Sequence, residues 1–348
     1  MSDADAHWSA ETLEYLGRCP VCGDTSREVA YEGVRDEVFG TPGAWDYWSC
    51  ACGVLYLDPR PAPHAIGAAY AGYYTHSSAG PPLRWRDPGF RGAVRRGYLN
   101  SRYGYRFADA SLLGALTWRL RRSAVKNLDF MIRHLPAPPR NGCRILDVGC
   151  GNGDFLGVAE DLGYAAVGIE PDPDAVRLAQ SSGFDVRRGS IPGTGEAAAS
   201  FNYIFLNHVI EHLHDPVAAL GEAKTLLVPG GRLWLSLPNI ASAGLRHFGR
   251  HWRGLEPPRH LALFDAVRLT SLLEMVGLER VRLLPPEEAA LFYFRQSQAI
   301  ACSLHPQAPD DPPEWEALAR QAAAANRHAR SAPLSAETLT MIAWNPQP

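Results

Sequence analysis

The sequence predicts an α/β fold in which helices cover both faces of a mostly parallel sheet. Short apolar runs of strand length occupy residues 143–149, 165–170, 184–190, 201–207 and 231–239. Helix-like stretches lie between most of these runs, at 153–162, 172–182 and 216–227. Strands that alternate with helices are typical of a parallel sheet covered on both sides. Two later apolar runs, at 278–285 and 337–345, are expected to close the sheet of a domain spanning 141–348, with a helical insertion at about 285–335 between them.

The composition is that of an ordinary globular protein. A hydrophobic content of 46% with 20% charged residues suits a chain that buries a core. The formal net charge of −3 argues against a general nucleic-acid binder, which usually carries a basic surplus. No uncharged apolar run approaches 18 residues, and the polar, acidic N-terminus is unlike a signal peptide. We therefore expect a cytoplasmic enzyme without a membrane partner.

Four of the seven cysteines lie close together in the first 62 residues. Cys19 and Cys22 belong to "CPVCG", Cys50 and Cys52 belong to "CACG", and 27 residues separate the two turns. A glycine follows the second thiol of each turn, so backbone N–H groups can point back at the sulfurs. Four thiolates in two short turns form a closed tetrahedral site that suits structural zinc. Four unpaired thiols or a redox CxxC explain the pattern less well, and we expect residues 1–62 to form a zinc-ribbon-like module.

Residues 63–140 are expected to form a helical, arginine-rich lid or linker. Three prolines in "DPRPAP" close the cysteine module, and a helix-like segment with Tyr70 and Tyr74 follows. Residues 81–125 then carry a local surplus of arginine and aromatic side chains. A solvated helical face or an oligomer contact explains this surplus as well as a lid that attracts a phosphate or carboxylate of a substrate. Both interpretations stay open.

The stretch "ILDVGCGNGDF" is the most informative part of the sequence. A strand ends at Asp147, and a glycine-rich loop then leads into a helix. A dinucleotide fingerprint would place the third glycine at position 154, but here it is Gly153, and an acid precedes the loop. A pyrophosphate prefers N–H donors without a nearby carboxylate. The acid instead suits the positive ammonium and sulfonium groups of S-adenosylmethionine.

A second acid supports the same cofactor. Glu170 ends the next predicted strand, 21 residues after Gly149. A carboxylate at this place can accept hydrogen bonds from both hydroxyls of a ribose. An acidic neighbour of a helix N-cap explains Glu170 taken alone, but not its combination with "DVGCGNG".

These motifs resemble those of the class I S-adenosylmethionine-dependent methyltransferases. "ILDVGCGNGDF" resembles the first motif of that family, "FNYIFLNHVIEHLHDP" its fourth-strand segment, and "LLVPGGRLWLSLPN" its helix-to-fifth-strand motif. More narrowly, "CPVCG…CACGVLYLDPRP", "HVIEHLHDP" and "GLEPPRHLALF" resemble a bacterial subgroup of biosynthetic enzymes that carry an N-terminal zinc-binding module. The resemblance implies a Rossmann-like sheet and methyl transfer from S-adenosylmethionine.

The resemblance also implies the residues that bind the cofactor. They are Asp147, Gly149, Cys150, Gly151, Asn152, Gly153, Glu170, Pro171, Ser190 and Asn207. One position departs from the family pattern. The family often has an acid after the third strand that reads the adenine amino group, whereas this chain has "RRGSIPG", so that only the Ser190 hydroxyl or a backbone group is left for that contact.

The segment after the predicted fourth strand supplies the catalytic candidates. In this fold the residues there face the methyl group, and His208 can take a proton from a hydroxyl or amine during attack. A hydrogen bond from His208 to the cofactor or to a neighbouring loop is the equal alternative. Glu211, His212 and His260 are expected as further catalytic or supporting groups. Tyr70, Tyr74 and Arg259 are expected to bind the substrate, although a salt-bridged loop explains Arg259 equally well.

A divalent metal is a second hypothesis for the same segment. One helical turn over 207–213 would place His208, Glu211 and His212 at i, i+3 and i+4 on one face. Two imidazoles and a carboxylate there can ligate a divalent ion. Related RNA and quinone-precursor methyltransferases use such a segment for metal, and in the RNA enzymes a later histidine, here His260, completes the site.

Two functions therefore compete. The first is methylation of a polar, probably anionic small molecule, such as a sugar, a sugar-nucleotide or a natural-product intermediate, most simply at oxygen. The second is methylation of RNA, with the zinc module contacting nucleic acid, or methylation of a biosynthetic intermediate at carbon or nitrogen. The net charge of −3 counts against nucleic acid.

Overall fold

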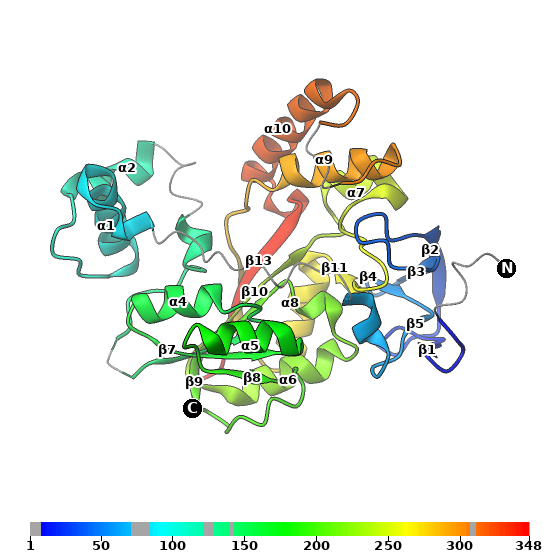
Figure 1. Cartoon of the computed structure of the whole chain (residues 1–348), viewed down its shortest axis with the longest axis horizontal. Coiled ribbons are helices and arrows are strands. Elements are labelled where there is room, and N and C mark those ends of the chain that lie inside the picture. Colours follow the sequence, from blue (N-terminus) through cyan, green and yellow to red (C-terminus); the bar gives the residue numbers. More distant parts are fainter. Residues whose placement is uncertain (1–7, 71–83, 121–127, 140–141, 307–310, 348) are drawn as a thin grey trace. The chain divides into compact units, whose positions relative to one another are not determined.

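The computed structural model describes residues 8–70, 84–120, 128–139, 142–306 and 311–347 (Figure 1). The chain forms two compact units. The first comprises 1–74, 206–225 and 232–348, and the second comprises 75–205 and 226–231. The strands of the large sheet follow the order β12-β13-β10-β9-β6-β7-β8. This order confirms the predicted Rossmann-like sheet.

The second unit contains the first strands of this sheet. They are β6 (Arg144–Val148), β7 (Ala165–Glu170), β8 (Val186–Arg188) and most of β9 (Phe201–Asn207). β7 pairs in parallel with both β6 and β8. Helices α4 (Asp154–Asp161) and α5 (Pro173–Ser181) connect these strands. α5 begins as its sequence predicts, because Asp172 caps the first turn and proline occupies the first helical position.

The first unit closes the sheet with two antiparallel pairings. β13 (Thr338–Trp344) lies between β10 (Leu227–Pro238) and β12 (Glu279–Leu283) and runs antiparallel to both. Helices α6 (Pro216–Leu226) and α8 (Ala266–Met275) precede β10 and β12. The predicted insertion between the last two strands contains α9 (Ala290–Ala301), α10 (Trp315–Ser331) and the short η6 (Pro333–Ser335).

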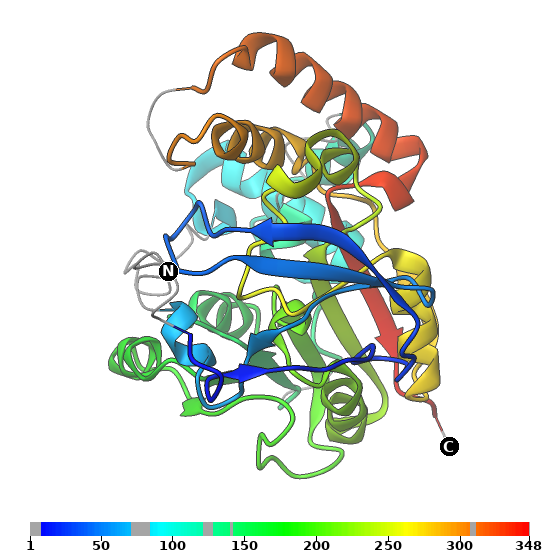
Figure 2. The same ribbon diagram turned by 90° about the vertical axis from the view of Figure 1, so that its right-hand side faces the viewer.

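The N-terminal segment forms a second, four-stranded sheet in the order β11-β4-β3-β2 (Figure 2). Its strands are β2 (Arg27–Val34), β3 (Trp45–Cys50), β4 (Val54–Leu57) and β11 (Ala262–Phe264). β1 (Leu13–Glu14) pairs separately with β5 (Arg60–Pro61). β11 comes from the far end of the chain, so the cysteine segment shares its sheet with a strand of the later domain. One core, which includes Tyr47, Leu57, Trp252 and Leu263, covers both.

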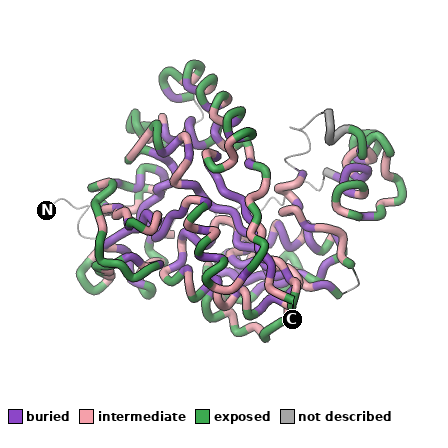
Figure 3. The backbone as a smooth tube through the Cα atoms, turned by 180° about the vertical axis from the view of Figure 1, so that it is seen from behind, coloured by how far each residue is buried: buried purple, intermediate pink, exposed green. Residues whose placement is uncertain are grey.

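The remaining helices are short or paired. They are η2 (Ile66–Tyr70), η3 (Arg84–Arg86), α1 (Gly89–Tyr103), α2 (Leu112–Leu120), η4 (Ile210–His212), α7 (Ala243–Phe248) and η5 (Gly249–His251). α1 and α2, from the arginine-rich stretch, pack closely because Gly97 and Gly114 leave room for the opposite backbone. No helix in the described parts of the chain is both long and apolar enough to cross a membrane. Buried residues follow the strands, whereas the helices alternate buried and exposed positions (Figure 3).

Candidate active site

The four early cysteines converge as the sequence predicts. Cys19 Sγ lies 3.7 Å from Cys52 Sγ, and Cys22 Sγ lies 3.5 Å from Cys50 Sγ. A zinc ion bound to four thiolates at about 2.3 Å would give sulfur–sulfur distances of about 3.8 Å. The amide of Gly23 donates to the Cys19 carbonyl, and both this glycine and Gly53 have positive φ angles, which fold the two turns tightly. The donor set therefore fits zinc in a closed site.

The glycine-rich loop of the second unit is held by Glu170. Its Oε2 accepts a hydrogen bond from the Gly151 amide at 2.8 Å, and its Oε1 accepts one from the Asp172 amide at 3.0 Å. Burial raises the pKa of this carboxyl. Gly153 has a φ of +87°, and a β-carbon there would lie 2.5 Å from the Phe184 ring, so only glycine fits. The acid that is predicted to bind ribose thus also shapes the loop.

Asp147 has a partner that the sequence did not reveal. It is completely buried and forms an ion pair with Arg133, whose guanidinium lies 3.9 Å from the centre of the Phe155 ring. Burial raises the pKa of Asp147, and the charge of Arg133 opposes that rise. The carboxylate is therefore already matched by a cation, which corrects the expectation that its charge is left for the cofactor. Arg133 lies in no recognisable motif, so sequence reasoning missed it.

The other cofactor-binding predictions occupy different environments. The Cys150 thiol is buried, and burial raises its pKa. Ser190 and Pro171 are exposed, and the Asn152 side chain accepts a hydrogen bond from the Asp154 amide at 3.2 Å. Asn207 ends β9, and its buried side-chain oxygen has no hydrogen-bond partner among the described residues. Such an orphaned acceptor is suited to a donor from a bound molecule.

His208 directly follows β9 and forms a pair with Glu211. The backbone at His208 has a φ of 54°, and its amide donates to the Ser236 carbonyl at 2.8 Å. Its Nδ1 lies 3.1 Å from Glu211 Oε1. The carboxylate only accepts hydrogen bonds when ionised, so Nδ1 carries the proton and Nε2 keeps a lone pair. The His208 side chain is 39% exposed, whereas that of Glu211 is fully buried.

The charge of Glu211 controls the protonation of His208. Burial lowers the pKa of His208, but the hydrogen bond and negative charge of Glu211 outweigh this effect, so that the pKa lies above its ordinary value. The pKa of Glu211 is lowered in turn, because its interactions with His208 and His212 outweigh its burial. The pair therefore favours a charged imidazolium once a proton arrives, as a general base requires.

The predicted helical turn over 207–213 is not present as expected. The only helical residues in this segment are those of η4, and His208 precedes them with a left-handed backbone. His208, Glu211 and His212 consequently do not share one helix face. His212 Nδ1 lies 3.0 Å from both the Tyr70 hydroxyl and the Arg259 carbonyl. The structure instead brings the ligand atoms of Glu211, His212 and His260 within 4.8 Å of one another.

The hydrogen bonds of this second group fix both imidazole tautomers. His212 Nδ1 can only donate to the Arg259 carbonyl, and His260 Nδ1 donates to the Gly254 carbonyl at 2.7 Å. Both Nε2 atoms therefore keep lone pairs, and Glu211 Oε2 is buried without a hydrogen-bond partner in the described structure. Burial lowers the pKa of His212 and brings that of His260 down to about 4. Three acceptors without a donor match the needs of a divalent cation.

Arg259 does not point toward a ligand, contrary to the prediction. Its side chain is fully buried, with ion pairs to Asp36 at 2.8 Å and Glu256 at 3.0 Å and a hydrogen bond to Thr41 at 2.9 Å. A guanidinium enclosed in this way binds the N-terminal segment rather than a substrate. Tyr70 contacts His212, as described above. Tyr74 lies outside the described residues.

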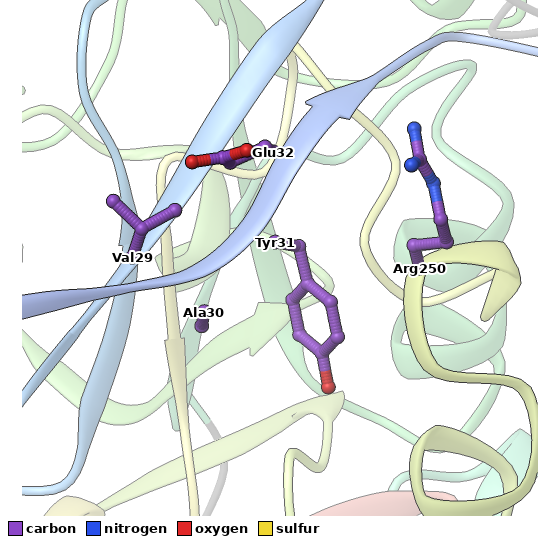
Figure 4. A pocket seen from close by; sticks show the side chains of 5 residues that line it. All are labelled: Val29, Ala30, Tyr31, Glu32 and Arg250. Carbon is purple, nitrogen blue, oxygen red and sulfur yellow. The ribbon is translucent and has the colours of Figure 1, made fainter.

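Two further features lie outside the predicted site. Glu287, in the loop after β12, is half-buried and interacts electrostatically with His208; burial raises its pKa to about 7. An open pocket of about 370 Å³ is lined by Val29, Ala30, Tyr31 and Glu32 of β2 and by Arg250 of η5 (Figure 4). None of the predicted site residues lines this pocket.

Comparisons with known proteins agree with the fold and with the glycine-rich loop. Residues 118–283 match the family model of a methyltransferase domain. A ubiquinone biosynthesis O-methyltransferase of Xanthomonas campestris is 28% identical over 172 residues, which cover 43% of this chain and 71% of the relative. A protein of the same name from Dinoroseobacter shibae is 33% identical over 170 residues, covering 43% of this chain and 65% of the relative. The structure of a methyltransferase from Archaeoglobus fulgidus covers 67% of this chain and 98% of its own, with 18% identity and a TM-score of 0.43.

The strand order, the glycine-rich loop after β6 and the acid that ends β7 define a Rossmann-like α/β protein with a site for a nucleoside-containing cofactor. The chain belongs to the class I S-adenosylmethionine-dependent methyltransferases. The family and the enzyme class predicted from the sequence are thereby confirmed.

Proposed function

We propose that the protein transfers a methyl group from S-adenosylmethionine to a hydroxyl oxygen of a polar small molecule, with His208 as the general base. The class of acceptor is a sugar, a sugar-nucleotide or a natural-product intermediate. The names of the curated relatives support transfer to oxygen. The observation that carries the proposal is the His208–Glu211 pair, which leaves Nε2 of a partly exposed imidazole free to accept a proton.

The chemistry assigned to the pair is a direct displacement. S-adenosylmethionine supplies an electrophilic methyl carbon on a sulfonium. The acceptor oxygen forms a bond to that carbon while the carbon–sulfur bond breaks, and the hydroxyl proton moves to His208 Nε2. Glu211, which is buried and ionised, stabilises the imidazolium that forms. The left-handed backbone at His208 and its amide hydrogen bond to Ser236 fix the ring in place, so that positioning adds to the rate.

The cofactor is assigned to the second unit. We propose that Glu170 binds the ribose hydroxyls through lone pairs that remain on oxygens already bonded to the loop, and that the amides of 149–153 contact the rest of the cofactor. Asn207 is assigned a donor of the cofactor, in keeping with its orphaned oxygen. The ion pair with Arg133 leaves Asp147 the role of a buried anchor for the loop.

The charge of the acceptor follows less directly. The predicted anionic substrate rested on Arg259 and on the arginine-rich stretch. Arg259 is consumed by buried carboxylates, so only the arginine-rich stretch supports an anionic group. The proposal therefore keeps a polar acceptor. RNA gains no support, because the net charge of the chain is −3.

Two metals belong to the proposal. Zinc is assigned to Cys19, Cys22, Cys50 and Cys52, where four thiolates leave no open position and the role is structural. A divalent ion is assigned to Glu211, His212 and His260 in place of the trio expected from the sequence, because their tautomers present lone pairs toward one point. There an ion would supply positive charge beside the His208–Glu211 pair.

A methyl-transfer screen tests the function. Purified protein is incubated with isotopically labelled S-adenosylmethionine and a panel of hydroxylated metabolites, and methylated products are identified by mass spectrometry. His208→Asn is the informative variant, because asparagine tolerates the left-handed backbone and can still donate to Glu211. We expect turnover to fall by about 10²–10⁴-fold with unchanged cofactor affinity by calorimetry. Unchanged turnover would exclude His208 as the base.

A further inference from the structure

The end of β12 lies at the same sheet edge as His208. The His208 amide donates to the Ser236 carbonyl, Ser236 is the register partner of Thr340, and the Thr340 carbonyl accepts from the Leu284 amide at 2.8 Å. These contacts form a line across β10 and β13 from the residue after β9 to the residue after β12. Loop 285–289 therefore leaves the sheet at the edge from which His208 emerges, about three strand spacings away.

Both ends of loop 285–289 are fixed. Leu284 is hydrogen-bonded to β13, and the Ala290 amide at the start of α9 donates to the Asn326 side chain of α10 at 3.1 Å. Glu287 is the middle residue of the loop. It is half-buried, and its charge is felt by His208, so the loop folds back toward the imidazole. A short loop held at both ends presents its central side chain in a defined place.

Glu287 and its neighbour Glu288 have different environments. Glu288 is exposed and forms an ion pair with Arg330 of α10 at 2.6 Å. Among the described residues, nothing donates a hydrogen bond to the Glu287 carboxylate, and His208 is the charged group that faces it. Burial without a donor raises its pKa to about 7, which shows that the carboxylate is incompletely solvated. A half-buried acceptor of this kind beside the proposed base is suited to a hydrogen-bond donor of a bound molecule.

We propose that Glu287 binds the methyl acceptor through a second donor, a hydroxyl or amino group that neighbours the hydroxyl to be methylated. This inference rests on the proposed function, because it takes His208 as the base that defines the acceptor's position. It narrows the substrate class to molecules with at least two neighbouring donors. Glu287 then acts in binding and orientation, and the proton of the reacting hydroxyl still goes to His208.

The test compares Glu287→Gln with Glu288→Gln on three probes: glucose, UDP-glucose and catechol. Each probe is paired with an analogue that lacks one hydroxyl, namely 2-deoxyglucose, UDP-2-deoxyglucose and phenol. A hydrogen bond to a charged group contributes enough that its loss should lower kcat/KM for the full probe by about tenfold or more. We expect the effect mainly in KM, with kcat changed less than about threefold. The analogue should respond far less to Glu287→Gln, and Glu288→Gln should match the wild type on every probe.

Three results would overturn the inference. Equal kinetics for the Glu287 and Glu288 variants would show that the loop does not contact the acceptor. An equal loss on a probe and its analogue would show that Glu287 contributes structure rather than a contact with the missing hydroxyl. Absence of methyl transfer by the wild type to all probes, with the cofactor bound in calorimetry, would remove the proposed function and this inference with it. Activity of the wild type therefore separates the two failures.

Discussion

Replacing Glu256 by glutamine should destabilise the first unit strongly, because Glu256 is the centre of a buried charge network. Its carboxylate forms ion pairs with Arg253 and Arg259, and Arg259 also pairs with Asp36. All four side chains are at least nine-tenths buried. Two cations thus face two carboxylates, and Glu256→Gln leaves one buried positive charge unmatched.

The size of the effect follows from the geometry. Unit charges about 4 Å apart attract by about 4 kcal/mol at an effective dielectric constant of about 20. Measured losses on breaking a buried pair are about 3–5 kcal/mol, since the partner charge stays in the interior. Glutamine keeps the shape and one acceptor oxygen, so cavity formation adds little. We therefore expect the free energy of unfolding to fall by about 4 kcal/mol.

Urea unfolding followed by tryptophan fluorescence provides the measurement, because Trp252 lies in the same core as the Glu256 segment. Glu279→Gln is the matched control: this glutamate begins β12 and is exposed, so its variant should stay within about 0.5 kcal/mol of the wild type. A loss below about 1 kcal/mol for Glu256→Gln would refute the argument.

Acid adds a second readout for the same residue. Burial raises the pKa of Glu256, but the charges of Arg253, His260 and Arg259 outweigh it, so the folded-state pKa lies far below 4.5. A carboxyl with a depressed pKa stabilises the fold above the unfolded-state pKa, and this contribution is lost as the pH falls below it. The unfolding free energy of the wild type should therefore drop below about pH 4.5, and that of Glu256→Gln should drop less steeply.

Three other predictions concern the ligand sites. Cys22→Ser should remove close to one equivalent of zinc in elemental analysis and lower the thermal unfolding temperature, and retention of full metal content would exclude the four-thiolate site. Gly153→Ala should weaken S-adenosylmethionine binding at least about tenfold in calorimetry, because the new methyl group collides with Phe184, and unchanged affinity would contradict that collision. Glu211→Gln should lower the affinity for added Mn²⁺ about 10–100-fold in a titration that leaves the structural zinc bound, and equal affinity would remove the second metal site.

The sheet was predictable because its signals are local. Each strand is a short apolar run between turn residues, and the order of strands and helices then leaves few topologies. The glycine-rich loop with Glu170 and the pairing of His208 with Glu211 also follow from spacings of a few residues. These are the parts of the site that the sequence analysis places correctly.

The errors concern contacts between distant residues. Arg259 was assigned to a substrate because its charge is visible in the sequence, whereas its partner Asp36 lies more than 200 residues away. Arg133 and Glu287 were missed for the same reason, since neither belongs to a motif. The histidine cluster failed at one backbone angle, because the left-handed conformation of His208 breaks the assumed helical turn.

The pairing of β4 with β11 makes the cysteine segment an internal part of the enzyme. Ala262, Leu263 and Phe264 of β11 are completely buried, and their register partners are Tyr56, Leu55 and Val54 of β4. β11 follows His260 by one residue, and β4 follows the last zinc-site cysteine by one residue. A chain shortened to the methyltransferase domain would leave the backbone of β11 without its neighbour beside the histidine. The cysteine segment thus resembles a keystone more than an appended cassette, and exchange of this segment between related enzymes would have to preserve the β4–β11 register.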